Sequence, residues 1–186
     1  MRRWTTPAVA VLAVAAFALL LVGSAQAKRI KEKSKFDSTF ALSWEQCPNL
    51  PEGTVITGSG KGKATDTSVQ NGDGTTTVGN HTTIRGDATD QEGNRYSFFY
   101  ENSFSVSNTT ADPATFSGIM DDFFSLDPKG KGKNKGEAQL ENGFEAIFTV
   151  GPGAGPAGFH FDELNSFGDP LDFSEENNGA PICDPL

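Results

Sequence analysis

Four lysines lie within the segment DPKGKGKNKG, residues 127–136, of a chain whose formal net charge is −9. Clustered ammonium groups next to glycines raise the question of a phosphate-binding loop, which requires G-x-x-x-x-G-K-[ST] between a strand and a helix. Neither this segment nor the related GKGK at 60–63 has that spacing. The segment therefore predicts either a solvated basic loop or strand face, or a weak anion contact, for example with an anionic polymer at the cell exterior. The residues that would make this contact are Lys129, Lys131, Lys133 and Lys135.

The two histidines, His81 and His160, are the other candidates for chemistry, because imidazole can transfer protons near neutral pH. No G-x-S-x-G motif accompanies them. The adjacent acids Asp121 and Asp122 would point to opposite faces of a strand, so they cannot act as a carboxylate pair. We assign no catalytic residue and expect no enzymatic activity. The alternative is a barrel-type isomerase or cyclase that uses a strand histidine and a carboxylate.

Neither a cofactor nor a metal ion is expected from the motifs. GAGPAG, residues 153–158, matches G-x-G-x-x-G, but a dinucleotide site needs a helix to open there. Pro156 and the alternating segment GFHF follow instead, which indicates a loop and a strand. Two isolated cysteines and two distant histidines also lack the spacing of metal ligands.

Cys47 and Cys183 are the only cysteines, so they allow a single intramolecular disulfide. That bridge would close a loop of well over a hundred residues, for which chain entropy predicts a stabilisation of roughly 4–5 kcal/mol. It would tie the C-terminal tail to the start of the domain.

The N-terminus has the organisation of a secretion signal. Arg2 and Arg3 precede an apolar run at 8–22, and Ala25-Gln26-Ala27 offers a cleavage site between Ala27 and Lys28. No second long apolar run follows, so we expect a secreted protein without stable membrane insertion of the mature chain. Cleavage removes two basic residues and no acid, which takes the formal net charge from −9 to −11. This acidity argues against general nucleic-acid binding.

Hydrophobic and polar residues alternate along most of the mature chain, which is typical of half-buried strands. In RYSFFYENSFSVS, for example, Tyr96, Phe98 and Tyr100 share one face. Glycines at 58, 60 and 62 alternate with polar residues, and such a glycine row would leave space for phenylalanine rings. QNGDGT, residues 70–75, contains the dipeptides most typical of hairpin turns.

These patterns predict an all-β fold with about seven or eight antiparallel strands, as an up-and-down or partly open β-barrel. A β-sandwich is the alternative architecture. The expected organisation is a signal peptide at 1–27, a charged lead-in at 28–35, a β-domain at 36–165 and an irregular acidic tail at 166–186, tied by the disulfide.

The segment NGDGTTTVGNHTTIRGDATDQEGNRYSFFYENSFSV resembles a pattern in small secreted bacterial β-barrel-like proteins of unassigned function. The matching positions form G-x-A-x-D-x-x-G-x-x-Y-x-F and are Gly86, Ala88, Asp90, Gly93, Tyr96 and Phe98. The quoted segment, residues 71–106, is 36 of the 159 residues of the mature chain. It implies secretion and a β-barrel-like domain, and it transfers no catalytic or binding residue.

The expected function is that of a secreted, non-enzymatic binding module. One form of it holds a small ligand in the barrel interior, lined by Tyr96, Phe98, Tyr100 and Asn102, unless these side chains only fill the core. The other contacts a cell-surface polymer through a lysine face.

Overall fold

The computed structural model describes residues 28–45, 47, 49–108, 115–130, 136–151, 159–169, 171–172 and 182–183. The expected signal peptide lies outside this part. No helix in the described part of the chain is long and apolar enough to cross a membrane.

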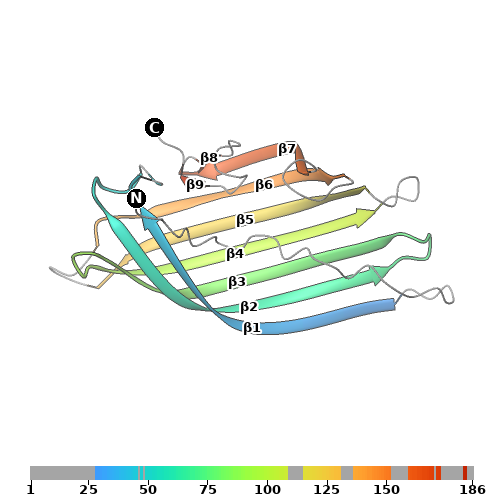
Figure 1. Ribbon diagram of the computed structural model, residues 1–186, viewed down its shortest axis with the longest axis horizontal. Coiled ribbons are helices and arrows are strands. Elements are labelled where there is room, and N and C mark those ends of the chain that lie inside the picture. Colours follow the sequence, from blue (N-terminus) through green and yellow to red (C-terminus); the bar gives the residue numbers. More distant parts are fainter. Residues whose placement is uncertain are drawn as a thin grey trace, which may run out of the picture.

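Seven strands form one antiparallel sheet in which every strand pairs with its neighbour in the sequence (Figure 1). The strands are β1 (Lys28–Ser43), β2 (Val55–Gln70), β3 (Thr76–Asp90), β4 (Arg95–Asn108), β5 (Phe116–Lys129), β6 (Leu140–Val150) and β7 (Phe159–Gly168). Two short strands, β8 (Leu171–Asp172) and β9 (Ile182–Cys183), pair separately. The predicted all-β, up-and-down antiparallel fold is confirmed. The seven-stranded sheet is open, because its order runs from β1 to β7 without joining the two ends.

Both boundaries of the predicted β-domain differ from those observed. β1 begins at Lys28, so residues 28–35 are the first half of a strand and not a lead-in. Their charged side chains obscured the alternation, because an edge strand can be polar on both faces. At the other end β7 continues to Gly168, and β8 and β9 lie within the segment that was expected to be irregular.

The hairpin predicted at 70–75 connects β2 and β3. Asn71 and Thr75 close it through a hydrogen bond from the Asn71 amide to the Thr75 carbonyl, 2.8 Å long. Gly74 has a φ of 88°, a left-handed conformation that glycine adopts without steric cost. Asp73 accepts hydrogen bonds from the Thr75 amide and hydroxyl, and these bonds lower the pKa of its carboxyl group.

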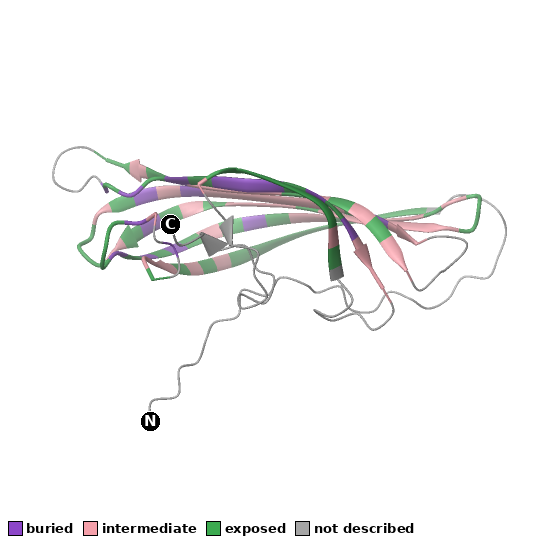
Figure 2. Ribbon diagram, turned by 90° about the horizontal axis from the view of Figure 1, so that it is seen from above, coloured by how far each residue is buried: buried purple, intermediate pink, exposed green. Residues whose placement is uncertain are grey.

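Strand register divides the side chains between two faces. We call the face that carries Phe40, Gly58, Ala88, Phe98 and Leu126 the core face, and the opposite one the outer face. Buried positions alternate with more exposed ones along the strands (Figure 2). The sheet therefore has one apolar and one polar side, as period-two patterns require.

At one end of the sheet, β1 and β2 bend across the other strands (Figure 1). Phe40 of β1 contacts Phe98 of β4 edge-on, with ring centroids 4.7 Å apart. Three strand spacings of about 4.8 Å separate β1 from β4 in a flat sheet, so this contact requires the bend. Glycines provide the space, because a Cβ atom at Gly58 would collide with the Phe40 ring and one at Gly86 would collide with Phe98. The predicted packing of phenylalanine rings against glycines is confirmed.

The main hydrophobic core lies under this bend, and we call this part of the sheet the packed end. It contains Cys47, Leu50, Ile56, Ala88, Tyr96, Phe98, Leu126, Ala138 and Leu140. The opposite end of strands β1 to β4 is called the open end. It comprises residues 28–35 of β1, 63–70 of β2, 76–83 of β3 and 101–108 of β4. The described side chains of β1 are all exposed there.

Candidate functional site

The lysine segment predicted to contact anions is described in part. Lys129 is the last residue of β5, and its ammonium group forms an ion pair with Asp87 of β3. This contact lowers the pKa of the Asp87 carboxyl group. Lys131, Lys133 and Lys135 lie outside the described residues, so their part in an anion contact stays a prediction.

A larger set of cations lies on the outer face of β1 and β2. Register places them side by side at the open end, with Lys35 directly opposite Lys63. All are exposed, and none forms an ion pair with another residue of the described chain. We call this set the basic face: Arg29, Lys31, Lys33, Lys35 and Lys63. Nearby, Lys61 is paired with Asp37 and is not included.

The far side of the outer face carries the opposite charge. Exposed carboxylates lie on the outer side of β5, β6 and β7: Asp121, Asp127, Glu141, Glu145, Asp162 and Glu163. The described part of the outer face is therefore positive along β1 and β2 and negative along β5 to β7. An acidic protein thus presents a local positive surface at one edge of its sheet.

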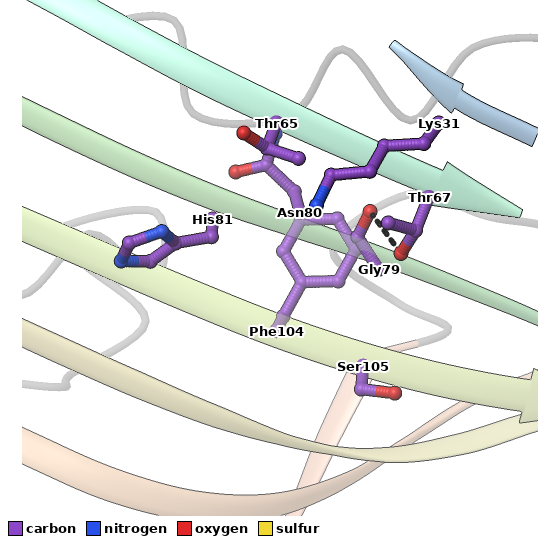
Figure 3. Close-up of a pocket in the computed structure, with 8 residues that line it drawn as sticks. All are labelled: Lys31, Thr65, Thr67, Gly79, Asn80, His81, Phe104 and Ser105. Atoms are coloured by element: carbon purple, nitrogen blue, oxygen red, sulfur yellow. Dashed lines mark hydrogen bonds between the residues drawn. The ribbon is translucent and has the colours of Figure 1, made fainter. Parts of the chain in front are cut away.

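A hollow of about 310 Å³ borders the basic face (Figure 3). Gly79 of β3 is one of the lining residues and contributes only main-chain atoms. Thr67 of β2 donates a hydrogen bond from Oγ1 to the Gly79 carbonyl at 3.3 Å, and Lys31 extends over the hollow from β1. The full lining comprises Lys31, Thr65, Thr67, Gly79, Asn80, His81, Phe104 and Ser105.

The two histidines considered for proton transfer both lie near carboxylates. His81 Nε2 is 2.7 Å from Glu101 Oε1, and His160 Nε2 is 3.9 Å from Asp162 Oδ1. The His81 and Glu101 side chains are 54% and 44% exposed. Both side chains are exposed to solvent, so an interaction between them contributes little to stability.

The side chains considered as a ligand lining are engaged within the protein. Tyr96 and Phe98 are buried in the core of the packed end. Tyr96 donates a hydrogen bond from its hydroxyl to Asp90 Oδ2 at 3.0 Å, and burial followed by this bond raises the pKa of Tyr96 to about 12. Phe98 packs against Phe40.

Tyr100 and Asn102 belong to a separate polar cluster on the core face. The Tyr100 hydroxyl and the Asn102 amide both donate to Asp122 Oδ2, at 2.8 Å and 2.9 Å. Burial raises the pKa of Asp122, and the two hydrogen bonds oppose that rise. Burial and the adjacent carboxylate also raise the pKa of Tyr100. The four predicted lining residues therefore serve two different clusters.

Cys47 is fully buried in the core of the packed end. It is not a free cysteine, and Cys183 lies in β9 opposite Leu171. The side chain of Cys183 lies outside the described residues, so the Cys47–Cys183 disulfide stays a prediction.

No three histidine, cysteine or acidic side chains in the described part of the chain are grouped so that they could hold a metal ion. Sequence reasoning does not identify the basic residues at 29–35 as a candidate site, because a short charged segment at the start of a domain indicates a lead-in. Their signal was present in KRIKEKSK, where every second residue from 29 to 35 is basic. The same alternation of basic residues occurs at Lys61 and Lys63.

No protein-family model, curated protein or solved structure matches this chain.

Proposed function

We propose that the protein is a secreted, non-enzymatic binding protein whose partner is a linear anionic polymer held by the basic face. The observation that carries this proposal is the set of five exposed cations without ion pairs in the described chain, on two neighbouring strands. Like charges directly opposite each other, such as Lys35 and Lys63, destabilise a sheet. An anionic partner would remove that cost.

The spacing of the cations favours an extended polymer over a small anion. Arg29, Lys31, Lys33 and Lys35 occupy every second position of β1, which places successive side chains about 6.6–6.8 Å apart. Each exposed ion pair contributes about 0.2–1 kcal/mol. A polymer that engages several of them at once gains from effective concentration, because later contacts form within the same complex.

The same surface is a poor match for nucleic acid. Single-stranded nucleic acids are held by aromatic side chains on which bases stack, in addition to basic groups. The basic face consists of lysines and one arginine, and its cross-strand neighbours on β2 include Thr65, Thr67 and Val69. A polymer without bases, such as an acidic polysaccharide, does not depend on stacking against aromatic side chains and could bind through the basic groups alone.

The other two functions suggested by the sequence have less support. A small-ligand carrier would use Tyr96, Phe98, Tyr100 and Asn102, but these side chains already have partners in the protein. An isomerase or cyclase would use a histidine with a carboxylate, and the pair His81–Glu101 has that composition. Its exposure to solvent argues against it, because water would screen the developing charge.

The test is retention of the mature protein on immobilised polygalacturonate, with neutral dextran as the matched matrix. We expect binding at low salt that weakens steeply as salt is added, because each contact releases counterions. The variant K31S/K33S/K35S/K63S should bind on the order of a hundredfold more weakly, at roughly 0.7 kcal/mol per lost contact.

The matched control is K129S/K131S/K133S/K135S, which removes the same number of charges from the lysine segment. Unchanged binding by this control supports the basic face. Loss of binding in the control alone would move the contact to the lysine segment and overturn the proposal, as would equal retention on dextran. Cleavage of the polymer that disappears in His81→Asn would overturn the non-enzymatic part.

A further inference from the structure

We infer that the hollow around Gly79 accepts one sugar ring of the bound polymer, which makes the partner an acidic polysaccharide and not a polyphosphate. This inference rests on the proposed function and names its substrate class. It is carried by the position of the hollow beside the basic face and by the chemistry of its lining.

Gly79 contributes only main-chain atoms to the lining, and neighbouring atoms surround the position where a side chain would begin. A Cβ atom added there would lie 3.0 Å from the Phe104 carbonyl oxygen and 3.0 Å from Thr67 Oγ1. Those are tight contacts, so even a methyl group would force the atoms next to Gly79 to shift. The volume of about 310 Å³ is at the lower end of the range for small-molecule sites. It suits a single ring and not a longer stretch of polymer.

The lining matches the hydroxyl groups of a sugar. Thr65, Thr67 and Ser105 each present a hydroxyl that can both donate and accept. Sugar hydroxyl groups can also donate and accept, so protein and sugar hydroxyl groups can form hydrogen bonds in either direction. The single protein hydrogen bond given by Thr67 leaves its lone pairs available as acceptors.

Strand register sets the order of these groups across the sheet. Lys31 lies opposite Thr67, Thr67 opposite Gly79, and Gly79 opposite Ser105. A ring seated over Gly79 would therefore have hydroxyl-bearing residues on either side and would meet the ammonium group of Lys31, which extends over the hollow (Figure 3). A carboxylate carried by that ring can reach Lys31, and the acidic groups of neighbouring rings can reach the other lysines of the basic face.

A polyphosphate would use this surface differently. It carries closely spaced negative charges but neither rings nor neutral hydroxyl groups. It would bind the ammonium groups and leave the hollow unused. The two polymer classes are therefore separated by changes that fill or alter the hollow and leave the net charge unchanged.

The experiment compares affinities for polygalacturonate and for long-chain polyphosphate. Ser105→Phe places a large ring at an exposed position in the lining, and Thr57→Phe places the same ring on the outer face of β2 outside the lining. We expect Ser105→Phe to weaken polygalacturonate binding at least about tenfold, as expected for one or two lost hydrogen bonds. Polyphosphate binding should change less than about twofold, and Thr57→Phe should affect neither.

Thr67→Val is the second variant, because it removes a hydroxyl at nearly constant volume. It should weaken polygalacturonate binding selectively even if Ser105→Phe does not fold. If the native protein binds both polymers and neither folded variant discriminates between them, the inference is wrong and the proposed function stands. If the native protein binds neither polymer, the proposed function itself is wrong.

Discussion

The packed end and the open end of the sheet use the same strands for different purposes. At the packed end, large rings from β1 and β4 meet over glycines of β2 and β3, and the bend of the sheet buries them. At the open end, β1 to β4 carry charged and hydroxyl side chains on the outer face, and β1 has no buried residue between 29 and 35. Stability and the proposed binding surface are therefore separated along the length of the strands. Substitutions at one end should leave the property of the other end unchanged.

The largest expected effect is at the packed end. Phe98→Ala removes a ring that is 5% exposed and contacts Phe40, so we expect a loss of about 3–5 kcal/mol in the free energy of unfolding. Phe99→Ala is the matched control on the outer face of the same strand. It loses a stacking contact with the Arg85 guanidinium, 4.4 Å from the ring centroid, and should cost about 1 kcal/mol. Equal losses in urea unfolding would contradict the division between the two faces.

A smaller effect is expected from filling the glycine row. Gly58→Ala would push a methyl group into the Phe40 ring, so we expect a destabilisation of about 1–3 kcal/mol. Gly72→Ala is the control, because nothing lies within 4 Å of its Cβ position. Thermal unfolding of the two variants measures the difference. A Gly58→Ala protein as stable as Gly72→Ala would mean that Phe40 does not pack on β2 as described.

Asp122 should make the stability of the protein depend on pH. Burial raises its pKa in the folded protein above the ordinary value of 3.8. The folded state therefore holds its proton to higher pH than the unfolded state, and stability falls as pH rises through that interval. The Asp122→Asn side chain does not titrate. The free energies of unfolding of the native protein and the variant should therefore diverge as pH rises from about 4, and their difference should become constant once Asp122 is ionised. Urea unfolding across pH measures this, and a constant difference would contradict the burial of Asp122.

The smallest effect is expected within the basic face. Lys35→Ser removes the repulsion with Lys63 across the strands, so we expect a gain in stability of about 0.2–1 kcal/mol at low salt. Lys61→Ser is the control, because it breaks an ion pair with Asp37 and should give no gain. Added salt should shrink the difference between the two variants. A loss of stability in Lys35→Ser would indicate that this lysine has a partner, and it would weaken the argument for an anionic ligand.

The strands and turns of this protein could be predicted locally. Alternation in RYSFFYENSFSVS and the turn residues of QNGDGT are sufficient, because side-chain direction in a strand repeats every two residues and hairpin turns require particular backbone angles. Alternation was least informative where both faces are exposed. Residues 28–35 have no apolar side. Their two-residue repeat consists of basic side chains, and the hydrophobic alternation that predicts a strand is absent from them.

The candidate site could not be predicted in the same way. Lys31, Thr67, Gly79 and Ser105 span 74 positions of the chain, yet they lie on four neighbouring strands at directly opposed positions of the sheet. Their proximity depends on the register of three strand pairs, which a single-residue shift would move to the opposite face.

Secondary structure and the polar or apolar character of each face follow from the chain alone, since both depend on neighbours one or two positions away. The bend that brings Phe40 onto Phe98, the openness of the sheet and the grouping of cations beside a glycine hollow do not. These features depend on how much each strand twists and where rings find space among glycines across several strands. That is a property of the assembled sheet, where packing and register act together over long distances in the sequence.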